Sequence, residues 1–549
     1  MRMLVLGLAA VVAAALAPTA SAGTWSSSVP FTNQVASTPF EGGGYPVPPG
    51  STAPLPGTCR LGDYNANRSE SWLAVRPGTE DLVGTSKVFF EKFSTFYMFH
   101  LGSYTIRNGR PAGNNIVQGY ECVSTGSTEE PPSWTDNTDP NVDFDTKGRA
   151  YQATLPFNAW WGNFFHPDAA IGVVYSDDLG RTWVKGNGGR FLHHVPNQSS
   201  KTLGDVEDKQ WIAVNHFPGT PTQDDVLAAW TVFNGFTAVI EYAVSRDRGQ
   251  TFTKPRRLTV PADQSGPSNT FVYPAYDAAG NVYIAFASFP VCCSSPAAVY
   301  VTRSSDGGDT WSPFVEVVGG LQTVGRLPNT TFRDGILEHF AASATYPGHL
   351  YLVYEAWDGI QMDVKFTQST DGGLTWSTPV KVNDNADAAG VPTDQFQPQV
   401  AAGPGGAVAI NFYDRRRACP SDPSVLPANV GRENVCIDVS LQAFKDTGRG
   451  AVPVGSNVRV SQFTWDPEQP RQRIDGIDQY ACAGHNDPCP LGTGFIGDYF
   501  GLAISAKNIY SLFVSTHYPS GVTGDGGEPV YYQQQVLAKV ARSAFGSGF

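Results

Sequence analysis

The sequence predicts an all-β fold, a β-propeller of four-stranded antiparallel blades. Four near-identical octapeptides with the pattern Ser-x-Asp-x-Gly-x-Thr-Trp/Phe begin at Ser176, Ser245, Ser304 and Ser369, at intervals of 69, 59 and 65 residues. Apolar strand pairs recur between them, and charged residues make up only 16% of a chain rich in glycine and aromatics. This composition favours strands and tight turns, and a long repeat is typical of propellers.

Each octapeptide has the chemistry of a hairpin tip. Its Asp can hydrogen-bond its own backbone, its Gly tolerates positive φ, and its aromatic re-enters the following strand. Alternating strands such as 171–175 and 298–302 precede it. We therefore place the octapeptides between the two outer strands of a blade. We interpret Asp177, Asp247, Asp306 and Asp371 as turn-forming rather than catalytic residues.

A second repeat pairs two apolar strands through a glycine-containing turn. Seven such openers, mostly 57 to 69 residues apart, favour seven blades, with six as the alternative. The predicted pairs cover 71–90, 139–155, 208–233, 272–289, 340–357, 397–413 and 498–517. The region around 440–448 is interpreted as a degraded octapeptide.

The two ends of the chain and one internal segment depart from the repeat. Residues 1–22 have the pattern of a cleavable signal peptide, cut after Ala22, so the protein is expected to be secreted. Residues 23–70 form a Pro/Gly-rich lead-in to a propeller over 71–549, with the stretch 530–541 as a candidate for the strand that closes the ring. A cysteine-containing insertion is expected at about 418–495.

Eight cysteines in a chain of this kind predict disulfides rather than a metal site. The expected pairs are Cys419–Cys436, Cys482–Cys489 and Cys59–Cys122, and Cys292–Cys293 could form a bridge between neighbours. The net charge of −13 argues against nucleic acid or an anionic membrane as the main partner. The sequence contains no phosphate-binding loop or clustered metal motif, so we expect no cofactor and no metal. No stretch after residue 22 is long and apolar enough to span a bilayer, so we expect no membrane insertion, and we expect a monomer.

In a propeller, ligands meet residues that precede each innermost strand or follow the second strand. This rule selects carboxylates for acid–base work, arginines for an anionic group and tryptophans for stacking on sugar rings. The pre-strand residues are Asp139, Asp208, Lys209, His339, Gln397, Asp498 and Tyr499. The post-strand residues are Asn158, Trp160, Trp161, Asn234, Glu355, Trp357, Asp358, Asp414, Arg415, Arg416, Arg417, His517 and Tyr518.

The octapeptides resemble the Asp-box (bacterial neuraminidase) repeats of the sialidase-like superfamily, over roughly residues 70–540. The resemblance implies a propeller, most often six-bladed in sialidases, among relatives that include other glycosidases and non-catalytic receptor domains. Sialidases use a tyrosine nucleophile with a glutamate, and three arginines that hold the substrate carboxylate. Arg415–Arg417 would supply one or two of these. The Arg-Ile-Pro motif of the first sialidase blade has its nearest match in Arg326-Leu327-Pro328, after the third octapeptide.

Together these features predict a secreted glycoside hydrolase of sialidase-like type that acts on extracellular glycans or polysaccharide. Its alternatives are a non-catalytic glycan- or protein-binding propeller and a polysaccharide lyase with His517 or Tyr518 as base. The expected catalytic residues are Glu355, Asp358, Asp414, Asp208 and Tyr499. The expected substrate-binding residues are Arg415, Arg416, Arg417, Trp160, Trp161, Trp357, His517 and Tyr518.

Overall fold

The protein is all-β, as the sequence predicts. The computed structural model describes residues 23–38, 67–89, 99–117, 136–158, 168–195, 205–234, 237–291, 294–330, 332–335, 337–387, 390–421, 428–467, 472–474, 476–479, 495–518 and 520–549. Within these ranges the helices are three short 3₁₀ turns, η2 (Asn187–Gly189), η3 (Pro404–Gly406) and η4 (Arg542–Phe545). No helix of the described residues is long and apolar enough to cross a membrane.

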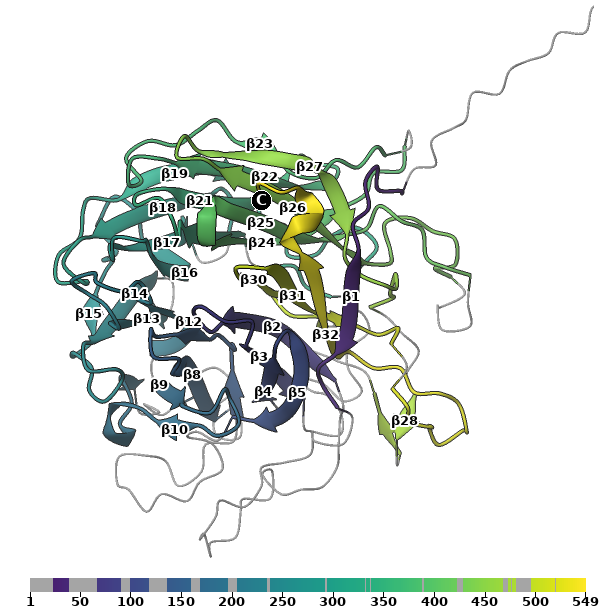
Figure 1. The fold of residues 1–549 in the computed structure, drawn as a ribbon, viewed down its shortest axis with the longest axis horizontal. Helices are drawn as coiled ribbons and strands as arrows, with labels where there is room; N and C mark the ends of the chain where they lie inside the picture. The colour runs from purple at the N-terminus through teal and green to yellow at the C-terminus, as the bar shows by residue number, and fades with distance from the viewer. Residues whose placement is uncertain are drawn as a thin grey trace, which may run out of the picture.

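Most strands pair with their neighbours in sequence, in antiparallel sets that run outward from the centre (Figure 1). The first sets are β2 (Arg68–Val75), β3 (Leu82–Phe89), β4 (Phe99–Arg107) and β5 (Arg110–Ile116); β6 (Asp136–Thr138) and β7 (Asp143–Phe144) with β8 (Ala150–Asn158), β9 (Asp168–Ser176), β10 (Val184–Lys185) and β11 (His193–Val195); and β12 (Asp205–Val214), β13 (Val226–Asn234), β14 (Thr237–Ser245) and β15 (Arg256–Arg257).

The remaining sets follow the same order. They are β16 (Ser268–Tyr276), β17 (Val282–Phe289), β18 (Ala297–Ser304) and β19 (Val315–Leu321); β20 (Glu338–Ala342), β21 (Leu350–Trp357), β22 (Met362–Ser369) and β23 (Val380–Lys381); β24 (Gln395–Gly403), β25 (Ala407–Asp414), β26 (Asp438–Asp446) and β27 (Ala451–Arg459); and β30 (Gly501–Ile504), β31 (Asn508–Ser515), β32 (Gln534–Ala541) and β1 (Phe31–Val35). A separate hairpin joins β28 (Arg473–Ile474) to β29 (Ile477–Asp478).

The innermost strands contact one another in a cycle. β2 contacts β7, and the contacts continue through β12, β16, β20, β24 and β30 back to β2. The second repeat seen in the sequence coincides with the hairpins that these strands form, from β2–β3 to β30–β31. The repeat therefore reports the start of each sheet, and the ring brings those starts together.

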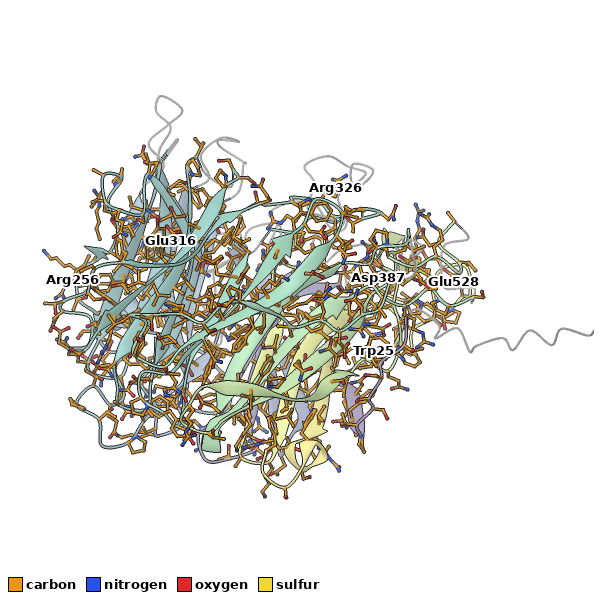
Figure 2. The ribbon with its side chains drawn as sticks, turned by 90° about the horizontal axis from the view of Figure 1, so that it is seen from above. Trp25, Arg256, Glu316, Arg326, Asp387 and Glu528 are labelled. Atoms are coloured by element: carbon orange, nitrogen blue, oxygen red, sulfur yellow. A yellow bond between two sulfur atoms is a disulfide. The ribbon has the colours of Figure 1, made fainter. Side chains whose placement is uncertain are left out.

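The outermost strand of the last sheet comes from the other end of the chain. β1 pairs antiparallel with β32, from Phe31 opposite Val540 to Val35 opposite Val536. Trp25, labelled in Figure 2, donates its indole N–H to Ser440 Oγ at 2.7 Å and lies over the guanidinium of Arg416. The segment 23–38 therefore ties the last sheet to the β24–β27 sheet.

The four octapeptides form the turns that join third to fourth strands, as predicted. In each turn the serine hydroxyl donates to the Asp two residues later, and the Thr hydroxyl four residues beyond that Asp donates to the same carboxylate. Asp247, Asp306 and Asp371 have the predicted role. For Asp177 the prediction was wrong by one residue, because Asp178 occupies the turn position while Asp177 forms an ion pair with Arg149 at 2.7 Å.

Cys419 and Cys436 form the predicted disulfide. The other predicted pairs, Cys59–Cys122, Cys482–Cys489 and Cys292–Cys293, lie outside the described residues, as does the signal peptide. The span 418–495, expected to be an insertion, contains β26 and β27, the outer two strands of a regular sheet. Its departure from the repeat therefore lies in the connections rather than in these strands.

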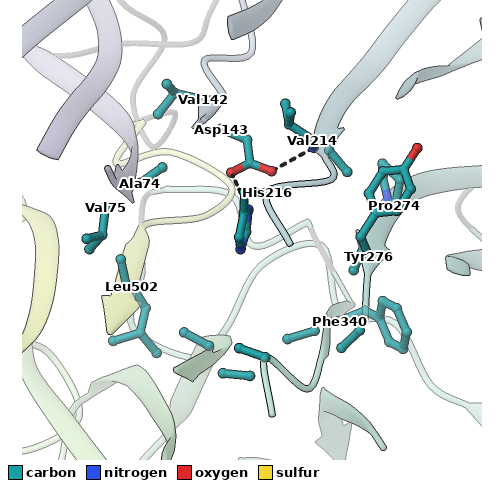
Figure 3. Close-up of a pocket in the computed structure, with 18 of the residues that line it drawn as sticks. Ala74, Val75, Val142, Asp143, Val214, His216, Pro274, Tyr276, Phe340 and Leu502 are labelled. Carbon is teal, nitrogen blue, oxygen red and sulfur yellow. Dashed lines mark hydrogen bonds and ion pairs between the residues drawn. The ribbon is translucent and has the colours of Figure 1, made fainter. Parts of the chain in front are cut away.

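Aromatic side chains close the centre of the ring. Trp72 and Trp211 meet edge to face with ring centroids 4.7 Å apart, and Tyr273, His339 and Tyr499 pack around them. Residues that follow these aromatics along the innermost strands line an axial cavity of about 210 Å³ (Figure 3). The wall is mostly Ala, Val and Leu, and Asp143 and His216 lie 3.8 Å apart in it. Residues that precede the aromatics form the polar site described next.

Candidate active site

Several innermost strands begin with the same backbone irregularity. The pairing register shifts at Glu70 in β2, after Asp208 in β12, at Phe271 in β16 and at Gln397 in β24. Glu70, Lys209, Phe271 and Gln397 have φ between 43° and 55°, a region that non-glycine residues rarely occupy. Bulges redirect side chains and are frequent beside active sites. Here they place charged and aromatic residues at the centre of one face.

Asp498 lies at the middle of a chain of ion pairs on this face. Arg333 donates to it through two nitrogens, at 2.9 and 2.6 Å, and Lys209 Nζ approaches it at 2.8 Å. Lys209 also lies 3.7 Å from Asp139, which is 3.3 Å from Lys87. Lys87 in turn contacts Glu70 at 2.7 Å. All of these side chains are at most 13% exposed except Arg333, at 45%, so Arg333 marks the side of the cluster that faces solvent.

The environment separates the acidities of these carboxyl groups. Burial alone would raise the pKa of Asp498, but Arg333 and Lys209 outweigh it and hold the pKa well below its usual range. At Asp139 burial likewise acts to raise the pKa, but the charges of Lys209 and Lys87 outweigh it and lower the pKa to about 2. At Glu70 burial prevails over Lys87 and raises the pKa to about 7. Ionised and protonated carboxyl groups therefore coexist at neutral pH.

Asp208, a predicted catalytic residue, is half-buried beside this network. Burial and the neighbouring Asp139 raise its pKa to about 6, against the opposing effect of Lys209. Tyr499, also predicted to be catalytic, is buried and donates its hydroxyl to the Pro140 carbonyl at 2.9 Å. Burial, Glu70 and Asp139 raise the pKa of Tyr499 well above its usual value. Its surroundings thus disfavour the phenolate that a tyrosine nucleophile requires.

Glu355, the first predicted catalytic residue, pairs with a carboxyl group that the sequence did not indicate. Glu355 and Asp334 lie close enough for their charges to interact, and the backbone N–H of Gln397 donates to Glu355 Oε1 at 2.6 Å. Burial raises the pKa of Asp334 to about 8, and burial with the Asp334 charge raises that of Glu355 well above its usual value. Ionisation of both of two adjacent carboxyl groups is unfavourable because the two negative charges repel each other, so the pair retains a proton at neutral pH.

This carboxyl pair lines a pocket of about 100 Å³. Phe271 and Phe289 form an aromatic wall, with ring centroids 5.9 Å apart and nearly perpendicular planes. Gln322 and Thr323 also line it. Phe271 contributes both to this pocket and to the small gap beside Lys209 and Asp139. Phe271 therefore lies between the carboxyl pair and part of the ion-pair chain, and Asp334 directly follows Arg333 in the sequence.

Other predicted carboxylates and arginines serve the framework. Asp358 is exposed and accepts hydrogen bonds from the backbone N–H groups of Ile360 and Gln361 in the β21–β22 turn. Asp414 is fully buried and accepts from Arg416 and from the Ser440 hydroxyl. These interactions leave Asp358 and Asp414 apart from the carboxyl pair.

The predicted arginine clamp is also committed to the protein itself. Arg415, fully buried, donates to the Pro328 and Asn329 carbonyls and lies 3.3 Å from Asp394. Arg416, almost fully buried, pairs with Asp414 and Asp384 at 2.8 Å each. Arg417 is exposed, next to both. Arg326 of the Arg-Leu-Pro match is also exposed (Figure 2).

The remaining predicted binding residues lie elsewhere. The Tyr518 hydroxyl donates to Asn33 Oδ1 at 2.6 Å and so supports the contact with the N-terminal segment, whereas His517 Nδ1 lies 3.1 Å from the hydroxyl of its neighbour Thr516. Trp357 is half-buried against the apolar core. Trp160 and Trp161 lie outside the described residues.

Sequence reasoning missed Glu70, Lys87, Arg333, Asp334 and Glu338. Glu70 directly precedes the opener that was placed at Ser71, and Lys87 lies near the end of the second strand of the same sheet, so the positional rule would have found both. Arg333 and Asp334 lie in the connection between β19 and β20, where no repeat indicates them. Within the described ranges, no group of three or more His, Cys, Asp or Glu side chains is placed to hold a metal ion.

Comparisons with known proteins give distant matches. No family model matches the chain, and no curated protein matches it. Among solved structures, the Hadza microbial sialidase Hz136 is 13% identical, with 82% of this chain and 74% of that chain covered and a TM-score of 0.41. A Penicillium chrysogenum α-L-arabinanase complexed with arabinobiose is 12% identical (74% and 93% covered, TM-score 0.36). An ulvan lyase of polysaccharide lyase family PL25 is 11% identical (71% and 81%, TM-score 0.37).

Proposed function

We propose that this protein is a secreted glycoside hydrolase that acts on extracellular glycans or polysaccharide. The observation that carries the proposal is the Asp334–Glu355 carboxyl pair in a pocket with an aromatic wall, beside the ionised Asp498. Hydrolysis of a glycosidic bond requires one protonated and one ionised carboxyl group around the scissile bond. Both states are present in this site at neutral pH.

In this mechanism the carboxyl pair acts as one acid. Two neighbouring carboxyl groups are too close to flank a sugar ring, so Asp334 raises the pKa of Glu355 and the proton that the pair retains passes to the leaving glycosidic oxygen. Asp208 takes the second role, because it is half-buried and its pKa of about 6 leaves it mostly ionised at neutral pH. It accepts a proton from the attacking water. Asp498 stays ionised and favours positive charge that develops on the sugar ring.

The ring of sheets supports a finer proposal for the fold. The cyclic contacts among β2, β7, β12, β16, β20, β24 and β30 favour a seven-bladed propeller, and β1 completes the last blade. The octapeptide turns then act as Asp-box repeats on the face opposite the carboxyl pair. Residues 1–22 are the proposed signal peptide, 23–70 the lead-in and 71–549 the propeller, with extra chain in the connections of 418–495.

A non-catalytic glycan-binding propeller is the second candidate. It is favoured by the near-complete burial of Glu70, Asp139 and Asp498 in mutual ion pairs, since such networks also serve purely structural ends. This function shares the pocket and its aromatic wall but needs no proton transfer. Turnover separates the two.

The test is release of sugar from a broad glycan panel by the purified protein and by two matched variants. Glu355→Gln removes the shared proton, and it is expected to lower kcat by roughly 100-fold or more. Asp358→Asn changes a carboxylate three residues away that holds only a turn, and it should leave kcat within about twofold. Equal activity of wild type and Glu355→Gln would refute the assignment. Glycan binding without release by the wild type would establish the binding propeller.

A further inference from the structure

The charge balance of the site indicates which glycans it accepts. Among the described residues, three cations border it, Lys87, Lys209 and Arg333, and each contacts a carboxylate of the same site. Arg333, the most exposed, gives two of its nitrogens to Asp498. An acidic sugar entering this site therefore meets cations that are already paired.

Carboxyl groups outnumber these cations. Burial already keeps some of the carboxyl groups protonated, and it raises the pKa of Glu338, which lies beside Tyr273 and Glu355, well above its usual value. A substrate carboxylate or sulfate would add negative charge where the protein's own acids cannot all ionise. The chain's net charge of −13 adds repulsion at longer range. The carboxyl groups of the site are Glu70, Asp139, Asp208, Asp334, Glu338, Glu355 and Asp498.

The same groups suit an uncharged sugar. Carboxylates accept hydrogen bonds, so they match sugar hydroxyls, which donate. The ring C–H face of a sugar can lie against Phe271 and Phe289, while Gln322 at the pocket wall supplies both donor and acceptor. An amino sugar adds an ammonium group, which would favour ionisation of the carboxyl groups that burial keeps protonated.

We infer that the site selects neutral or amino sugars and rejects sialic acid, uronic acids and sulfated sugars. This inference rests on the proposed glycan-acting function and opposes the acid-sugar substrate that the octapeptides' resemblance implies. It makes Asp498 a specificity residue, because its carboxylate forms ion pairs with both Lys209 and Arg333. Without it, Arg333 would lose its carboxylate partner and Lys209 would keep only Asp139, so Arg333 could bind an acidic sugar.

The test is an array of neutral, amino, uronic, sialylated and sulfated glycans. Binding is measured with Glu355→Gln, which holds substrate without turnover, and release is measured with the wild type. We expect neutral or amino glycans to be bound at least tenfold more tightly than acidic ones. Preferential binding or release of acidic glycans would overturn the inference while leaving the hydrolase standing. Selective binding of neutral or amino glycans without release would support the inference and overturn the hydrolase. No binding and no release in any class would overturn both.

A variant that removes the negative charge of Asp498 tests its role in this preference. Asp498→Asn should raise affinity for acidic glycans at least tenfold relative to neutral ones. Since Asp498 is buried and its loss can impair folding, Asp208→Asn provides a half-buried alternative with the same expected direction. Asp358→Asn removes a negative charge outside the site and should not change the preference. An unchanged preference in folded Asp498→Asn and Asp208→Asn would contradict the proposed charge selection.

Discussion

Aspartates in two regions of this molecule are chemically identical and physically opposite. In the octapeptide turns, Asp306 is exposed and accepts hydrogen bonds from the hydroxyls of Ser304 and Thr310, which lower its pKa. In the pocket, Asp334 is buried against another carboxyl group, and its pKa rises to about 8. The first arrangement stabilises the ionised form and the second stabilises the proton. The difference teaches that repetition identifies structural aspartates here, whereas the pocket Asp334 lies outside the repeat.

The largest expected difference between the two kinds of aspartate is in catalytic activity. Asp334→Asn should lower kcat/KM by roughly 100-fold, since the amide cannot share the proton of Glu355. Asp306→Asn should leave kcat/KM per folded molecule within about twofold, because it alters a turn on a third-to-fourth strand connection. Steady-state kinetics on one released sugar compare the two. Equal losses in both variants would show that Asp334 acts through stability alone.

The second expected effect is on the dependence of activity on pH. Activity should be bell-shaped, since Asp208 loses its ability to accept a proton below about 6 and Asp334 loses its proton above about 8. The rate should fall about tenfold per pH unit beyond each limb. In Asp208→Asn the remaining activity should lack the acid limb. Retention of that limb would assign it to another group.

Stability against pH separates buried from exposed acids. Burial raises the pKa of Glu338, so its contribution to stability is complete below its unfolded pKa and is lost as the pH rises. Glu338→Gln removes that loss and should raise the free energy of unfolding by about 1 to 2 kcal/mol at pH 8, and by less at pH 4. Urea unfolding measures this, with the exposed Glu316→Gln as the control. A gain at pH 4 as large as that at pH 8 would contradict the assignment.

The smallest expected effect lies in the turns. Asp371→Asn weakens the hydrogen bonds to Thr375 and should lower the free energy of unfolding by about 1 kcal/mol. The lowered pKa of Asp371 means that its contribution is present above the unfolded pKa and is lost as the pH falls through the folded pKa. The variant and the wild type should therefore converge in urea unfolding at pH values below the lowered pKa of Asp371. A difference that persists there would point to the shape of the turn rather than its charge.

The repeat pattern in the sequence predicted more of the fold than of the candidate site. Spacing located the innermost hairpins, and the positional rule selected Asp139, Lys209, Gln397 and Asp498 from four different sheets. It could not show that Arg415 and Arg416 turn inward, because a run at a strand end does not say which of its members is buried. Nor could it reach Asp334, whose role depends on a connection folding back against Glu355.

The pairing of β1 with β32 also constrains the order in which the sheets of this molecule can fold. Its two strands lie at opposite ends of the chain, from Phe31 opposite Val540 to Val35 opposite Val536. The sheet they complete cannot form until the chain from residue 31 to residue 540 has been synthesised. Contacts this distant in sequence form slowly, because a very long loop must close first. The last sheet is therefore the last to become complete, and until β32 has been made, β1 lacks this partner strand and a chaperone or another chain could pair with its edge.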